Sequence, residues 1–196
     1  MPHYYSKKQN SDLRLIKINV QLKEDLFQLF SGSGVFSKKK LDRGTELLIN
    51  NMIIKDEWKV LDLGCGIGVV GIYVKRNYPD SEVMMTDVNT RAVKLARKNV
   101  ELHKLDIDVK DSDGFKKIKK KFDCVLLNPP QSAGKDLCFR LIENSFEHLK
   151  PDGKLQLVAR HNKGGRHLSK KIEEVFGNME VVAKGSGYRI YMGSKE

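Results

Sequence analysis

The sequence predicts an α/β fold: a seven-stranded, mostly parallel sheet with helices on both faces and an antiparallel hairpin at its end. From about residue 58 onward, short apolar runs alternate with segments of helical periodicity. This alternation is typical of parallel sheets that helices cover on both faces. Near the end of the chain, two short strand-like runs flank a Gly-Ser-Gly turn at residues 185–187, which indicates the hairpin.

The strands of the predicted sheet are short apolar runs bounded by turn residues. The five parallel strands are expected at residues 59–63, 82–86, 107–109, 122–127 and 155–159, and the hairpin strands at residues 179–183 and 188–192. Four helices are expected, at residues 69–78, 89–103, 135–149 and 168–176. Apolar residues recur at helical spacing in the second helix, and Asn89 or Thr90 is suited to cap its first turn.

The first fifty residues carry the weakest pattern. We expect one compact unit, in which residues 1–50 form an N-terminal cap segment and residues 51–196 form the catalytic domain, because a chain of 196 residues fits one domain. Residues 13–22 partly alternate between apolar and polar side chains, which indicates a strand. Together with residues 25–30 this strand is expected to cover the functional site.

The composition narrows the possible partners. The formal net charge is +11, which favours a polyanion such as nucleic acid or an anionic membrane, although a lysine-rich solvated surface also explains it. The longest apolar run falls short of the roughly 18 residues of a membrane span, and the N-terminus lacks a signal-peptide pattern. We therefore expect a cytoplasmic protein without a membrane partner. The three cysteines form no Cys-x-x-Cys pair, so neither a disulfide framework nor a metal site is expected.

Glycine and polar residues follow the predicted parallel strands, at the edge where open α/β sheets bind ligands. The first strand leads into the run Asp62-Leu63-Gly64-Cys65-Gly66-Ile67-Gly68. Its glycines permit a tight turn and close approach of a ligand, and the helix behind it directs N–H groups at that ligand. Asp87, with its neighbour Val88, ends the second strand and can accept ribose hydroxyls. Ser112 and Asp113 follow the third strand, where they can meet an adenine edge.

Two cofactors are compatible with this glycine run. Residues 66–71 match the dinucleotide pattern G-x-G-x-x-G. Asp62 argues against that cofactor, because its carboxylate would face a pyrophosphate. The same carboxylate suits the ammonium and sulfonium groups of S-adenosylmethionine (SAM). We therefore expect SAM; the alternatives are a nicotinamide or flavin dinucleotide, or a structural loop in which Asp62 only caps N–H groups.

Three stretches of the chain resemble a known family. The glycine run resembles that of class I SAM-dependent methyltransferases, which have a Rossmann-like fold, and residues 128–130 resemble the Asn-Pro-Pro-aromatic motif of members that methylate exocyclic amines or side-chain amides. Residues 35–45 resemble the segment before the first strand of the small-domain methyltransferases, which include ribosomal RNA guanine-N2 methyltransferases. The resemblance implies that RNA, naked or in a ribosomal particle, is the substrate and that Thr45 lies beside the cofactor.

Asn128, Pro129 and Pro130 are the expected catalytic residues. An exocyclic amine is a poor nucleophile because its lone pair is delocalised into the ring. The side-chain oxygen of Asn128 and the carbonyl of Pro129 can accept its N–H bonds, which frees the lone pair and stabilises the positive charge that develops on nitrogen. Asn128 is also expected to contact the cofactor. The prolines should stiffen the loop and leave its carbonyls free of internal pairing. The alternative is a rigid turn that only ends a strand.

The substrate is expected to contact Gln131, Phe36, Arg160 and Lys163. Gln131 stands where an aromatic residue of the motif would stack on the substrate, and its amide can bind a base edge instead. Phe36 is then the candidate for stacking, with packing in the core as an equal alternative. Arg160 and Lys163 follow the fifth strand and are expected to contact phosphates, whereas the lysine run at residues 116–121 should be a solvated face at the opposite edge.

Three functions remain open. The leading one is methylation of the exocyclic amine of guanine in ribosomal RNA. Because of the departure at Gln131, methylation of a protein glutamine amide or of a small molecule is the alternative. The third is a non-catalytic protein that binds SAM or RNA, against which the intact Asp62, Asp87 and Asn128 argue.

Overall fold

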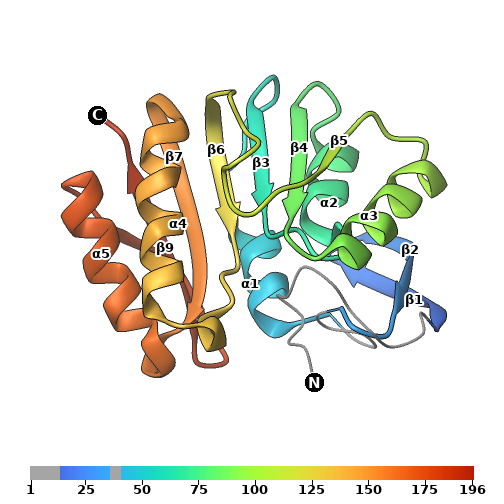
Figure 1. Cartoon of the computed structure of the whole chain (residues 1–196), viewed down its shortest axis with the longest axis horizontal. Coiled ribbons are helices and arrows are strands. Elements are labelled where there is room, and N and C mark those ends of the chain that lie inside the picture. Colours follow the sequence, from blue (N-terminus) through green and yellow to red (C-terminus); the bar gives the residue numbers. More distant parts are fainter. Residues whose placement is uncertain (1–13, 36–40) are drawn as a thin grey trace.

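The computed structural model, which describes residues 14–35 and 41–196, contains the predicted seven-stranded sheet (Figure 1). The strands are β3 (Lys59–Leu63), β4 (Glu82–Asp87), β5 (Asp108–Asp111), β6 (Phe122–Leu127), β7 (Leu149–Arg160), β8 (Glu180–Gly185) and β9 (Tyr188–Ser194). Their order is β5-β4-β3-β6-β7-β9-β8. The first five in this order pair in parallel, and β9 pairs antiparallel with both β7 and β8. The predicted fold class is therefore confirmed.

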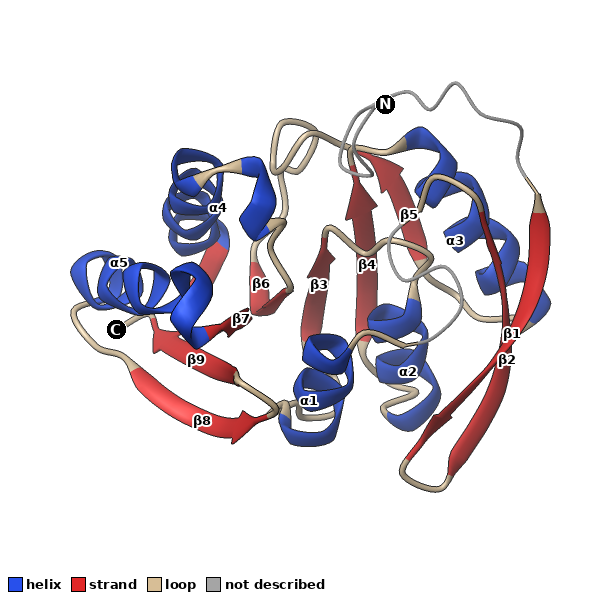
Figure 2. Ribbon diagram, turned by 90° about the horizontal axis from the view of Figure 1, so that it is seen from below, coloured by secondary structure: helices blue, strands red, loops and turns tan. Residues whose placement is uncertain are grey.

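Helices cover both faces of the sheet. Figure 2 shows this in a view onto the carboxyl ends of the parallel strands. They are α1 (Arg43–Asn51), α2 (Val69–Asn77), α3 (Thr90–Leu102), α4 (Lys135–His148) and α5 (Arg166–Phe176). One hydrophobic cluster joins α1, α2 and α3 to the sheet, and a second joins α4 and α5 to its other face. Side chains alternate along a strand, so the fully buried Val60 and Leu61 of β3 belong to different clusters.

The elements depart from the predicted ones at α1, at the start of β7 and at two short turns. Helix α1 was not expected; it begins at its N-cap Asp42, whose side chain accepts the N–H of Thr45. Strand β7 starts at Leu149, directly after α4, because Leu149 pairs with Phe122 before the register shifts. Two short turns were also not expected, the 3₁₀ helix η1 (Gln131–Ala133) and the π-type turn η2 (His161–Gly165). No helix in the described part of the chain is both long and apolar enough to cross a membrane.

The N-terminal segment forms an antiparallel hairpin of β1 (Leu15–Leu22) and β2 (Asp25–Gly32) beside α3 (Figure 2). Asn99 of α3 fastens it. The side-chain oxygen of Asn99 accepts the N–H of Phe30 at 2.7 Å, and its amide donates to the carbonyls of Phe30 at 3.0 Å and Ile67 at 2.9 Å. Since Ile67 belongs to the glycine run, one buried side chain joins the hairpin to that run. The division into residues 1–50 and 51–196 stays a prediction.

We expect Asn99→Ala to lower the free energy of unfolding by about 3 kcal/mol. The substitution leaves the buried partners of the amide without hydrogen bonds, and each such group costs about 1–3 kcal/mol. Urea unfolding measures the change. The control is Asn51→Ala, which removes an exposed amide that donates to Leu47 and should cost no more than about 0.5 kcal/mol. Equal losses in the two variants would contradict the fastening role of Asn99.

Candidate active site

A cavity of about 270 Å³ lies at the carboxyl ends of β3, β4, β5 and β6. Most of the residues that the sequence singled out lie in its wall. They are Thr45, Asp62, Gly64, Cys65, Gly66, Asp87, Val88, Ser112, Asp113, Asn128, Pro129 and Pro130. Ile18 and Val20 of β1 also line the cavity, so the hairpin forms part of the site. Segments from seven places in the chain, from β1 to α4, thus enclose one space.

The glycine run presents its main chain to this cavity. Gly64 and Gly66 have φ angles of 75° and 57°, in the left-handed region that side chains disfavour. A Cβ atom at either position would meet nothing within 4 Å, so the main chain there is open to a ligand. Gly68 lies outside the wall; its φ is 91°, it caps α2, and an added Cβ would lie 3.1 Å from the Cε of Met85. Its place in the structure is a packing position rather than a contact surface.

Two carboxylates make the wall acidic, the buried Asp62 and the half-buried Asp87. Asp62 is only 4% exposed, and its Oδ2 accepts the N–H of Gly71 at 2.9 Å. Burial raises the pKa of Asp62 to about 7, and the nearby charge of Asp87 adds to the effect. Asp87 accepts the N–H groups of Gly66 and Asn89, both at 2.8 Å, and burial raises its pKa as well. Asp62 therefore both caps a main-chain N–H and faces the cavity, and the pair of carboxylates suits a cationic ligand.

Asn128 stands at the end of β6 with its amide fixed. Its Nδ2 donates to Oδ2 of Asp42 at 3.1 Å and to Oγ1 of Thr45 at 3.0 Å. A carboxylate only accepts hydrogen bonds, so the amide nitrogen must face Asp42 and the carbonyl oxygen Oδ1 must point away. Within the described residues no donor contacts Oδ1. Asn128 thus offers an unused acceptor in the wall of the cavity.

The expectation that the loop carbonyls stay free of internal pairing is wrong. The carbonyl of Pro129 accepts the N–H of Gln131 at 2.8 Å, and that of Pro130 accepts the N–H of Ala133 at 2.8 Å. The cause is η1, which begins directly after the prolines and needs acceptors for its N–H groups. A carbonyl has two lone pairs, so Pro129 keeps the capacity to accept one further hydrogen bond.

Three of the residues expected to bind the substrate, Gln131, Arg160 and Lys163, lie outside this wall. Both ends of the Gln131 amide bind the main chain. Nε2 donates to the carbonyl of Lys163 at 2.8 Å, and Oε1 accepts the N–H of Arg160 at 2.9 Å. Arg160 donates through Nε to the hydroxyl of Tyr188 at 2.9 Å. Lys163 is exposed beside a second, smaller hollow of about 90 Å³. Phe36 lies outside the described residues.

Two polar residues at the site were not assigned a role from the sequence. Asp42 lies in the wall of the cavity, and Tyr188 of β9 donates to Asp42 through its hydroxyl at 3.3 Å. Asp42, directly ahead of a segment with apolar residues, is of a residue type that favours the N-cap, and this signal could have located α1. Tyr188 comes from the far end of the chain, and the sequence carries no signal for its contact.

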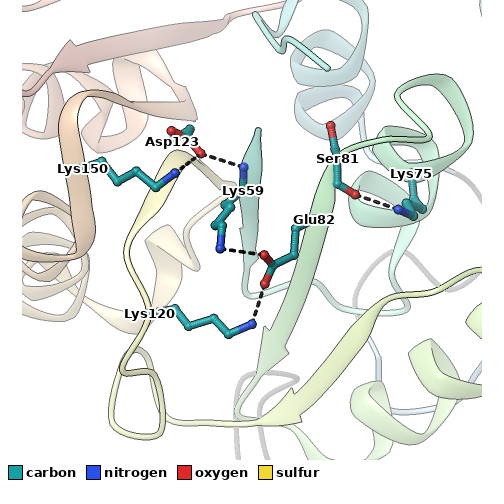
Figure 3. A network of polar contacts seen from close by, with 7 residues as sticks. All are labelled: Lys59, Lys75, Ser81, Glu82, Lys120, Asp123 and Lys150. Carbon is teal, nitrogen blue, oxygen red and sulfur yellow. Dashed lines mark hydrogen bonds and ion pairs between the residues drawn. The ribbon is translucent and has the colours of Figure 1, made fainter. Parts of the chain in front are cut away.

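Ion pairs lie at the opposite edge of the sheet, where the parallel strands begin (Figure 3). Glu82, at the start of β4, pairs with Lys59 and Lys120, and these lysines lower the pKa of Glu82 to about 2. Asp123 accepts the N–H of Lys59 at 2.8 Å and the Nζ of Lys150 at 2.7 Å. Lys120 belongs to the lysine run at residues 116–121, and it lies at the strand starts, away from the cavity.

A glycine turn, two acidic strand ends and an Asn-Pro-Pro turn around one cavity define a methyltransferase of the Rossmann-like class. Residues 27–192 match the family described as the methyltransferase small domain. The chain is 36% identical to the uncharacterized protein YbxB of Bacillus subtilis over 98% of each chain. It is also 36% identical to the ribosomal RNA small subunit methyltransferase C of Haemophilus influenzae, over 83% of this chain and 50% of that protein.

A solved structure shares the fold. The T. thermophilus 16S rRNA N2 guanine methyltransferase, in complex with AdoMet and guanosine, superposes with a TM-score of 0.79 at 22% identity, over 95% of this chain and 52% of that one. The chain therefore belongs to the methyltransferase small domain family. It spans about half the length of the ribosomal RNA methyltransferases that it matches.

We expect Asp62→Asn to stabilise the ligand-free protein at pH 8 and to do so less at pH 5. The folded state raises the pKa of Asp62 from 3.8 to about 7, so between these values it holds a proton that the unfolded chain releases. Stability from this group is fully present below about pH 4 and is lost as the pH rises to about 7. Between pH 5 and pH 8 the asparagine variant therefore avoids a loss of roughly 3 kcal/mol. Urea unfolding at several pH values measures it. A difference between the two proteins that is the same at pH 5 and pH 8 would contradict the burial of a charge at Asp62.

Proposed function

We propose that this protein transfers a methyl group from SAM to the exocyclic N2 amine of a guanine in ribosomal RNA. The observation that carries the proposal is the unused Oδ1 of Asn128, held in the wall of an acidic cavity by Asp42 and Thr45. An amine that reacts with a methyl sulfonium needs such an acceptor. Relatives that are 36% identical and are named as ribosomal RNA methyltransferases support RNA as the substrate.

The described residues of the cavity fit SAM. The open main chain at Gly64 and Gly66 leaves room for a closely approaching ligand. Asp87 would bind the ribose hydroxyls, and Asp62 would face the positive charge. Val88, Ser112 and Asp113 would lie along the adenine. When bound there, SAM supplies an electrophilic methyl group.

The residues of this chain act on the amine. Oδ1 of Asn128 and the remaining lone pair of Pro129 would accept its two N–H bonds and turn its lone pair out of the plane of the ring. These acceptors also stabilise the positive charge that develops on nitrogen. The proton can leave to water afterwards, so no general base is required. The thiol of Cys65 does not accept the methyl group, because burial raises its pKa well above the usual value and keeps it protonated.

A basic surface beyond the end of β7 would hold the RNA. Nε of Arg166 donates to Nε2 of His161 at 3.1 Å. Burial, and after it the charges of Arg189, Arg166 and Lys184, lower the pKa of His161. Lys163 is exposed on the neighbouring turn η2. A net charge of +11 supports phosphate contacts by this surface. We propose that the partner is ribosomal RNA, naked or in a particle, and that the protein is cytoplasmic.

The experiment that tests the function is methyl transfer from radiolabelled SAM to total RNA, naked ribosomal RNA, isolated ribosomal subunits and a protein extract in parallel. Label in RNA that digests to N2-methylguanosine supports the proposal, and the comparison of naked RNA with subunits identifies the substrate. Label confined to protein favours methylation of a side-chain amide. Binding of SAM without label in any acceptor points to a non-catalytic protein.

We expect Asn128→Ala to lower kcat by about 10²–10³, the loss that removal of one oxyanion-hole donor causes in other enzymes, while the Kd for SAM stays unchanged. Asp87→Ala should show the reverse pattern, with weaker SAM binding by calorimetry. Asn144→Ala changes an exposed asparagine of α4 and serves as the control. Full activity of Asn128→Ala would refute the acceptor role, and unaltered SAM affinity of Asp87→Ala would refute the ribose contact.

We expect Lys163→Glu to weaken RNA binding and to lower the slope of log K against log salt by about one, because one phosphate contact is lost. Lys119→Glu makes the same change of charge at an exposed position of the lysine run and is the control. Filter binding between 50 and about 200 mM salt measures both. Identical salt slopes for the two variants would show that Lys163 does not contact the RNA.

A further inference from the structure

Asn128 is one end of a chain of polar side chains that crosses the molecule to its surface. Asp42 accepts four hydrogen bonds. Its Oδ2 binds the Nδ2 of Asn128 and both the N–H and the hydroxyl of Thr45, and its Oδ1 binds the hydroxyl of Tyr188. The Tyr188 oxygen in turn accepts Nε of Arg160 at 2.9 Å. The chain therefore runs from the cavity through α1 and β9 to the exposed end of β7.

We propose that Asp42 and Tyr188 are positioning residues for methyl transfer, which hold Asn128 with its carbonyl oxygen toward the amine of the substrate. The inference rests on the proposed function, because it gives these residues a part in the same reaction. Neither residue needs to touch the reacting atoms. Asp42 acts through the amide of Asn128, and Tyr188 acts through the carboxylate of Asp42.

The charge of Asp42 fixes which way the amide faces. If Asn128 were flipped, its Oδ1 would face a carboxylate oxygen that can only accept, and two acceptors would meet. The negative charge also polarises the amide, because a hydrogen bond from Nδ2 to a carboxylate increases the electron density on Oδ1. A stronger acceptor at Oδ1 stabilises more of the positive charge that forms on the amine. Orientation and acceptor strength thus have the same source.

Asp42 is itself held in place from two sides. It is the N-cap of α1, where the helix dipole favours a negative charge, and Tyr188 binds its second oxygen. Tyr188 is only 8% exposed, and its ring packs against Gly44, where a Cβ atom would lie only 2.8 Å from Cε1. The guanidinium of Arg160 lies over the ring, 5.2 Å from its centre. Packing and hydrogen bonds thus hold both Asp42 and Tyr188 in place.

Kinetics of Asp42→Asn and Tyr188→Phe test the inference. The asparagine keeps an acceptor for Thr45 and loses the charge, so kcat should fall by about 10–100-fold with KM and the Kd for SAM unchanged; the phenylalanine should lower kcat by about 3–10-fold. The matched controls are Asp123→Asn, a half-buried carboxylate that also accepts a main-chain N–H but lies at the opposite edge (Figure 3), and Tyr78→Phe. A change in KM alone, or equal losses in variants and controls, would overturn the inference.

A double substitution separates positioning from a general effect on folding. If Asp42 acts through Asn128, Asp42→Asn should cause no further loss of kcat in an Asn128→Ala protein. Losses that multiply would show that Asp42 acts independently of Asn128 and would overturn the proposal.

The side-chain amide of Asn128 gives a readout that needs no turnover. In ¹⁵N-labelled protein its resonance is identified by its absence from Asn128→Ala. It should exchange slowly with solvent in the wild type and faster in Asp42→Asn and Tyr188→Phe, while Asp123→Asn leaves it unchanged. An unprotected amide in the wild type overturns the positioning role. If the wild type methylates no RNA, the proposed function fails, and this resonance still decides whether Asp42 and Tyr188 fix the amide.

Discussion

The site depends on the reversal of strand order between β3 and β6. From β3 the sheet grows outward through β4 and β5, and the chain then returns to place β6 on the other side of β3. The loops after these two adjacent strands therefore lead to opposite faces, and a crevice opens between them. The glycine run follows β3 and Asn128 follows β6, so the topology brings the cofactor loop and the amine acceptor to one opening. No local interaction could do this, because the two segments are far apart in the sequence.

The acidic wall of the crevice costs stability in the ligand-free protein and favours binding of a cationic ligand. Placing Asp62 and Asp87 in its wall takes two carboxylates out of water, and both pKa values rise because of burial. Main-chain N–H groups of Gly71, Gly66 and Asn89 offset part of that cost. The remainder is the free energy that a cationic ligand can recover. The same residues that make the ligand-free protein less stable at neutral pH therefore make the cavity selective for a positively charged molecule.

The sequence predicted what depends on local pattern and failed where distant segments meet. Strands β3 and β6, buried on both faces, are short apolar runs and were located at their observed bounds. The carboxyl-end rule gathered Asp62, Asp87 and Asn128 in advance. The direction of the Asn128 amide was out of reach, because Asp42 and Thr45 lie 86 and 83 positions away. The hydrogen bonds of Gln131 could not be predicted for the same reason. Both ends of its amide bind the main chain of Arg160 and Lys163, which lie far along the sequence.

The packing of Tyr188 on Gly44 makes the residue types allowed at these two distant positions depend on each other. A methyl group at position 44 would lie within 3 Å of both the Tyr188 ring and the Asp42 carboxylate. Any side chain there requires a smaller residue at position 188, and a smaller residue leaves Oδ1 of Asp42 without the hydroxyl of Tyr188 that donates to it. Among descendants that keep this geometry, positions 44 and 188 must therefore vary as a pair or not at all.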